Sequence, residues 1–108
     1  MHRLIIKLDA TRLDNPDLDI RYKLPDLLIE RSHGLIQDDG YVYGTNTLWL
    51  LLYLRTTDVD AAMRHIVDVV DNIRLFENDL RPATTVALET TDGDRILYPP
   101  NSTGVFTR

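Results

Sequence analysis

One stretch of this sequence restricts the fold more than any other: residues 47–55, which read TLWLLLYLR. Successive side chains of a strand point to opposite faces, so the even-numbered leucines share one face and Trp49, Leu51 and Tyr53 share the other. A short segment that is apolar on both sides is typical of a strand inside a sheet. The apolar run at 48–54 is also far shorter than the roughly 20 residues that span a membrane. We therefore expect residues 47–55 to form a central strand.

Three other segments have the alternating pattern of strands. Residues 3–9 alternate in polarity, and so do residues 84–90. The turn residues at 92–93 then lead into a strand at 95–98. The side chains expected beneath the helices are Leu4, Ile6, Leu8, Leu48, Leu50, Leu52, Leu54, Val86 and Leu88.

Helical spacing is clearest at residues 58–74. The start of this helix, residues 57–60, has the form of a capping box with Asp in place of Glu. The apolar positions of this helix are Val59, Met63, Ile66, Val70 and Ile73. A first helical region is expected either as one helix that begins near Asn15-Pro16-Asp17 and is broken at Pro25, or as a loop followed by a short helix from Pro25; in both cases it stops at Gly34. Between the two helices, residues 38–40 predict a tight turn and residues 44–46 predict another, so a hairpin or meander fits.

The order strand, helix, strand, strand, helix, strand is typical of a ferredoxin-like split βαβ sandwich. We expect an α+β fold with an antiparallel sheet, helices on one face only and an extra C-terminal strand. The 108 residues are enough for one domain, placed at residues 1–100, and residues 101–108 are expected to form a polar C-terminal tail.

Charge and composition exclude several classes of protein. The chain has 12 Lys and Arg against 17 Asp and Glu, a net charge of -5, which opposes binding to nucleic acid by counterion release. It has no cysteine, so it forms no disulfide and no thiolate metal site. The first residues lack the apolar core of a signal peptide. We expect a cytoplasmic protein that does not enter a membrane.

Catalytic and metal-binding motifs are weak in this sequence. His2, His33 and His65 have no partners at the spacing of metal ligands, and Ser32 and Ser102 do not lie in the setting of an activated nucleophile. The five glycines are isolated, so they do not form a phosphate-binding loop. We expect no catalytic residue, no metal and no cofactor, so a function other than catalysis is favoured.

The second face of the sheet is the candidate contact surface. Alternation places Trp49, Leu51 and Tyr53 there, and we expect other aromatic and apolar residues beside them with a charged rim. An aromatic centre inside such a rim is typical of protein interfaces. The predicted partner-binding residues are Trp49, Leu51, Tyr53, Arg55, Tyr41 and Tyr43. The alternatives are that the C-terminal tail or the region of Tyr22 covers this face, or that the aromatics are scattered and exposed.

Three functions fit an aromatic sheet face. The favoured hypothesis is a non-enzymatic protein-binding module, most concretely a small acidic immunity or antitoxin-like protein that neutralises a toxin. The alternative is a homodimeric ferredoxin-like enzyme or small-ligand-binding protein that packs sheet against sheet as an α+β barrel. Stacking of single-stranded RNA is disfavoured by the net charge. The sequence therefore predicts a protein partner or a second copy of the chain.

Overall fold

The computed structural model describes residues 1–44, 48–102 and 104–108. Its elements, in chain order, are β1 (His2–Asp9), the short 3₁₀ helix η1 (Ala10–Arg12), α1 (Ile20–Arg31), β2 (Ile36–Tyr43), β3 (Trp49–Thr56), α2 (Val59–Asn72), the 3₁₀ helix η3 (Arg81–Ala83), β4 (Thr84–Thr90) and β5 (Gly93–Tyr98). Thr47 of the predicted strand, and Thr45 and Asn46 of the predicted turn, lie outside the described residues. No helix in the described part of the chain is long and apolar enough to cross a membrane.

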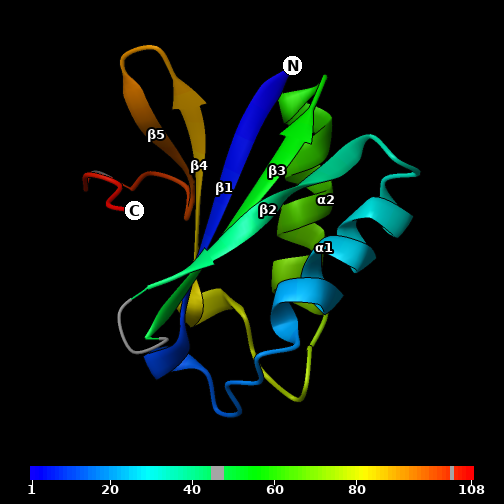
Figure 1. Cartoon of the computed structure of the whole chain (residues 1–108), viewed down its shortest axis with the longest axis vertical. Helices are drawn as coiled ribbons and strands as arrows, with labels where there is room; N and C mark the ends of the chain where they lie inside the picture. Colours follow the sequence, from blue (N-terminus) through cyan, green and yellow to red (C-terminus); the bar gives the residue numbers. More distant parts are fainter. Residues whose placement is uncertain (45–47, 103) are drawn as a thin grey trace.

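The five strands form one antiparallel sheet in the order β2-β3-β1-β4-β5 (Figure 1). The predicted α+β class and antiparallel sheet are confirmed. Strand β3 is an interior strand, as expected from its two apolar sides, and β1 is the middle strand. Strands β2 and β5 are the two edges.

The main core lies between the sheet and the two helices. Leu4, Ile6 and Leu52 are fully or almost fully buried, and they belong to one cluster with side chains of both helices. The helical members of that cluster are Ile20, Leu24, Leu28, Ala62, Ile66, Val69 and Val70. Leu48, which was expected in this core, is instead about half exposed; it precedes β3, which begins at Trp49.

Helix α2 follows its predicted pattern, with a different start. Ile66 and Val70 are buried and Met63 packs partly against the core. The N-cap is Asp58, whose carboxylate accepts a hydrogen bond from the Ala61 amide at 3.0 Å. The predicted capping box beginning at Thr57 is therefore wrong by one position, since Asp58 is itself a strong N-cap residue and satisfies a free amide of the first turn.

Helix α1 begins at Ile20, later than the predicted start near residues 15–17, and it is continuous through Pro25, although a break was expected there. The proline occupies the second turn and is buried, and its missing amide removes only one backbone bond of the helix. The predicted glycine stop is confirmed: Gly34 has φ of +84° and its amide bonds to the Ile29 carbonyl at 3.0 Å, which caps the end of the helix.

The predicted turn at residues 38–40 is wrong. These residues lie inside β2, where the register against β3 shifts between Asp38 and Tyr41. Gly40 has φ of +100°, a conformation that glycine adopts without the steric cost of a side chain. The same residue types that suit a turn therefore form a β-bulge here.

We predict that replacing Ile66 by Ala lowers the free energy of unfolding by about 2–5 kcal/mol, because the side chain is buried between α2 and the sheet. The exposed neighbour Arg64, replaced by Ala, is the control and is expected to change stability by less than about 0.5 kcal/mol. Urea denaturation followed by circular dichroism measures both. Equal effects of the two substitutions would contradict the assigned inner face of α2.

Candidate contact surface

The second face of the sheet carries a small apolar cluster of its own. Ile5 and Ala87 are fully buried and Leu51 is nearly so. They are covered by Phe106, which is only 9% exposed, and Trp49 packs partly against the same cluster. Phe106 belongs to the segment 104–108, which follows β5 and lies across this face. The chain therefore covers its own aromatic face.

Polar contacts hold the segment 104–108 in place. The guanidinium of Arg108 donates to both carboxylate oxygens of Asp94, each at 2.8 Å, and to Glu89 at 2.7 Å. The ammonium of Lys7 donates a hydrogen bond to the carbonyl oxygen of Thr107. The hydrogen bonds from Arg108 hold the pKa of Asp94 below its usual range. Planar contacts between an arginine and two carboxylates fix orientation as well as charge, so the segment has a defined position.

The residues predicted for partner binding on this face are therefore mostly covered. Leu51 is buried, Trp49 and Tyr53 are half-buried, and the guanidinium of Arg3 lies 4.3 Å from the centre of the Tyr53 ring. Arg55 is exposed, and its Nε lies 3.5 Å from the carboxylate of Asp39. One alternative from the sequence was that the C-terminal tail covers the face of Trp49, and Phe106 of that tail does lie on this face.

Tyr41 and Tyr43 lie on the other face of the sheet from Trp49. In the pairing with β3, Tyr41 faces Leu52 and Tyr43 faces Leu50, so both tyrosines share the side that carries the helices. The expectation that they lie beside Trp49 is wrong. The bulge at Gly40 places one extra residue in β2, and one extra residue reverses the face of every later side chain.

The two tyrosines form a cluster with the start of α1. The rings of Tyr22 and Tyr41 meet edge to face at 6.2 Å, and those of Tyr41 and Tyr43 at 5.7 Å. The guanidinium of Arg21 lies 4.4 Å from the centre of the Tyr22 ring and donates to the Tyr43 hydroxyl at 3.2 Å. The positive charge of Arg21 beside its ring lowers the pKa of Tyr22, whereas the neighbouring Tyr22 raises the pKa of Tyr41. Cation, hydroxyl and ring contacts thus fix the aromatic side chains at this edge.

Three of the large apolar side chains that are left exposed lie at this place: Leu18 is 53% exposed, Tyr22 is 50% and Tyr41 is 41%. Leu18 precedes α1, Tyr22 lies in its first turn, and Tyr41 lies near the end of β2. Strand β2 is the edge strand, and α1 runs beside it (Figure 1). We call these three residues the edge patch. The sequence predicted Tyr41 as a contact residue but not Leu18 or Tyr22 beside it, because a period of two cannot show which strand lies at an edge.

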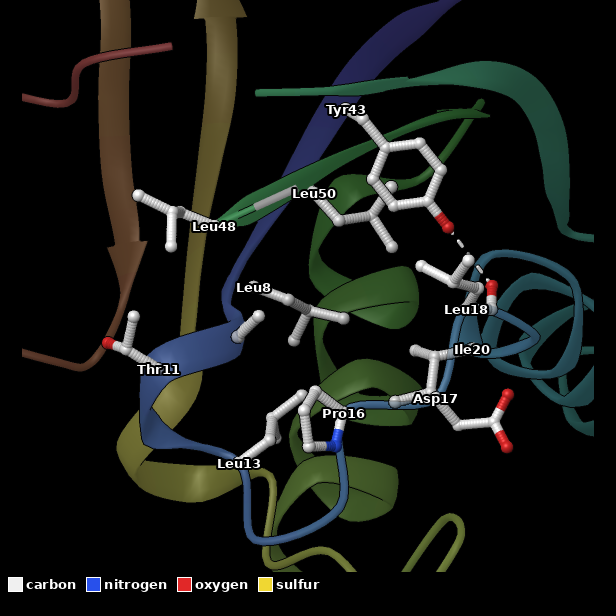
Figure 2. Close-up of a pocket in the computed structure, with 11 residues that line it drawn as sticks. Leu8, Thr11, Leu13, Pro16, Asp17, Leu18, Ile20, Tyr43, Leu48 and Leu50 are labelled. Atoms are coloured by element: carbon white, nitrogen blue, oxygen red, sulfur yellow. Dashed lines mark hydrogen bonds between the residues drawn. The ribbon is translucent and has the colours of Figure 1, made fainter. Parts of the chain in front are cut away.

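A cavity of about 280 Å³ opens beside the edge patch. Figure 2 shows the side chains of Leu8, Leu13 and Leu50 around it, with the hydroxyl of Tyr43 bonded to the carbonyl of Leu18 at 3.1 Å. The full lining is Leu8, Ala10, Thr11, Leu13, Pro16, Asp17, Leu18, Ile20, Tyr43, Leu48 and Leu50. Its walls are mainly aliphatic, and this lining suits an apolar occupant rather than an ion.

Among the described residues, no group of three or more His, Asp or Glu side chains is placed to hold a metal ion. His33 is exposed just beyond α1, and His65 lies half-buried on α2. Ser32 uses its hydroxyl to accept a hydrogen bond from the Ile36 amide at 3.0 Å, a structural contact between α1 and β2.

Comparison with known proteins gives no relative: no family model, no curated protein and no solved structure matches this chain.

We predict that replacing Phe106 by Ala lowers the free energy of unfolding by about 1–3 kcal/mol and makes Trp49 more accessible to iodide, since Phe106 covers the same cluster. Trp49 is the one tryptophan of the sequence, so its fluorescence reports this face alone. Val105, which is 91% exposed, is the matched position, and its replacement by Ala is expected to change neither quantity. If iodide quenches Trp49 equally in the wild type and in the Phe106 variant, Phe106 does not cover this face.

Proposed function

We propose that this chain is a non-enzymatic protein-binding module with a ferredoxin-like fold, and that it binds through the edge patch. The chain order β1-α1-β2-β3-α2-β4, with β5 added, and the sheet order β2-β3-β1-β4-β5 support this fold. The packing of both helices against one set of sheet side chains supports it too.

The observation that carries the proposed function is the gathering of exposed apolar side chains at one place. Tyr22 and Tyr41, each about half exposed, lie beside the guanidinium of Arg21, which also donates a hydrogen bond to the carbonyl of the exposed Leu18 at 3.4 Å. Tyr and Arg are the residue types enriched at the centres of protein interfaces. Contiguous exposed apolar residues of this kind mark interaction sites more often than scattered ones.

The concrete form we favour is neutralisation of a partner protein by a small acidic protein of the immunity or antitoxin type. Such a protein needs shape, aromatic anchors and charge, but no catalytic group. The net charge of -5 favours a basic partner, because opposite charges speed association.

The cavity beside the edge patch supports a second candidate, a small-ligand-binding protein. Its aliphatic walls of Leu8, Leu13 and Leu50 suit a small neutral molecule, and its polar hydroxyl at Tyr43 is already engaged. The two candidates differ in what they bind, so binding of an apolar dye without any protein complex would favour the second.

Replacing Tyr41 by Asp tests the proposed function, because it places a charge in the edge patch on a side chain that is not part of the core. We predict that binding to the protein encoded by the neighbouring gene, or to a second copy, weakens by at least about 30-fold, equivalent to about 2 kcal/mol. Calorimetry measures the complex with the neighbour, and analytical ultracentrifugation measures self-association.

Val105→Asp is the control, since it adds the same charge at an exposed position outside the edge patch. Circular dichroism checks that both variants are folded. The proposal fails if a folded Tyr41 variant binds as tightly as the wild type, or if the chain forms no complex with either partner.

A further inference from the structure

Within the described part of the chain, no segment outside β3 forms a hydrogen bond with the backbone of Tyr41 or Tyr43. The amide of Gly44 donates to the carbonyl of Trp49 at 2.8 Å, so Gly44 is a hydrogen-bonded partner of β3. Hydrogen-bonded positions alternate along an antiparallel strand, and Val42, opposite Leu51, is therefore the next one. The amide and carbonyl groups of Tyr41 and Tyr43 consequently point away from β3, towards the edge where the sheet order ends.

The two edges of the sheet differ in their protection against such pairing. Strand β5 carries Asp94 and Arg95 at its start and is followed by Pro99 and Pro100 at its end. Charges, prolines and bulges are the features that keep edges from pairing with other chains. In β2 those features occupy only the first half, at residues 38–40, where Asp38 and Asp39 flank the bulge. The second half, residues 41–43, carries no charge.

The sequence of this open half is symmetrical: Tyr41-Val42-Tyr43 reads the same in both directions. When a second copy lies antiparallel to the first with a two-fold axis at Val42, Tyr41 of each copy faces Tyr43 of the other. All four tyrosines then lie on the helical side of the joined sheet, where cross-strand aromatic pairs are favourable. The outward amides and carbonyls of the two strands bond to each other, and no unpaired backbone group is left at 41–43.

Charge fits this arrangement. A two-fold axis at Val42 places Asp38 and Asp39 of the two copies on opposite sides of the axis, so the acidic halves of the strands do not face each other. The guanidinium of Arg21 lies 5.6 Å from the centre of the Tyr41 ring and 5.9 Å from that of Tyr43, so the rings face a cation of their own chain. The carboxylates of residues 38 and 39 therefore stay apart at the contact although each chain has a net charge of -5.

We propose that the partner of the edge patch is a second copy of this chain, joined through residues 41–43 of β2 into one continuous sheet with a two-fold axis at Val42. This inference rests on the proposed binding of a protein through the edge patch. A second copy would occupy the same residues as a basic partner, so self-pairing is an alternative to the neutralisation favoured above. The contact is isologous, so it closes at a dimer and leaves the protected edge of β5 at both ends of the joined sheet.

The experiment uses the absence of cysteine from the sequence. Val42 is a position at which facing residues of the two copies do not exchange hydrogen bonds, so their Cα atoms lie about 4.5 Å apart, within the range for a disulfide. We predict that Val42→Cys forms a cross-linked dimer on mild oxidation at least about tenfold faster than Val105→Cys. The control is matched in chemistry and more exposed, at 91% against 47%.

Sedimentation equilibrium of the wild type and of Val42→Lys measures the affinity of the dimer without a cross-link. The wild type is expected to form a dimer, and the lysine variant to dimerise at least about tenfold more weakly because two like charges meet at the axis. Val105→Lys is expected to match the wild type.

A wild type that stays monomeric, or a Val42→Cys variant that cross-links no faster than Val105→Cys, overturns the self-pairing. The proposed function is judged separately. If the chain is monomeric but loses a neighbour-encoded partner on Tyr41→Asp, protein binding through the edge patch holds and only the second copy is excluded. If no protein binds at all, both fail.

Discussion

Burial of β1 on both faces is the constraint on which the rest of this structure depends. Leu4, Ile5 and Ile6 are consecutive and all fully buried, although neighbouring side chains of a strand point to opposite faces. The strand also pairs on both sides, with β3 and with β4. Each face of the middle of the sheet must therefore be covered by other parts of the chain.

The two faces are covered in different ways. Side chains of α1 and α2 pack against Leu4 and Ile6, and Phe106 packs against Ile5. The second cover is a short extended segment rather than a helix, and its position depends on one aromatic ring and on the contacts of Arg108 with Asp94 and Glu89. Because this segment covers the aromatic face, the exposed aromatic side chains Tyr22 and Tyr41 lie at the edge of β2 instead.

Much of the fold was predictable because its strands and α2 have unambiguous periods. Ile66 and Val70 were placed correctly by helical spacing, and the strands at 84–90 and 95–98 by alternation and a turn. The face of Tyr41 was wrong because Asp and Gly suit both a turn and a bulge, and only the pairing partner decides between them.

The candidate site was less predictable from the sequence, because it depends on contacts between segments rather than on a local period. The cover by Phe106 and the contact of Arg108 with Asp94 join segments far apart in the strand pattern, and no local period encodes them. No local period encodes the contacts of Asn78 either. Its buried side-chain amide forms hydrogen bonds with the backbone of Asn15 at 2.7 Å, and these join the segment before α1 to the segment after α2.

The central claim is that β2 has an open edge which pairs with another chain. Amide hydrogen exchange of three consecutive residues tests it most directly. In dilute protein the amides of Tyr41 and Tyr43 should exchange fast while that of Val42, bonded to β3, exchanges slowly; at high protein concentration all three should be slow. Fast exchange at Tyr41 and Tyr43 at every concentration, or protection of both in dilute monomer, would contradict the account.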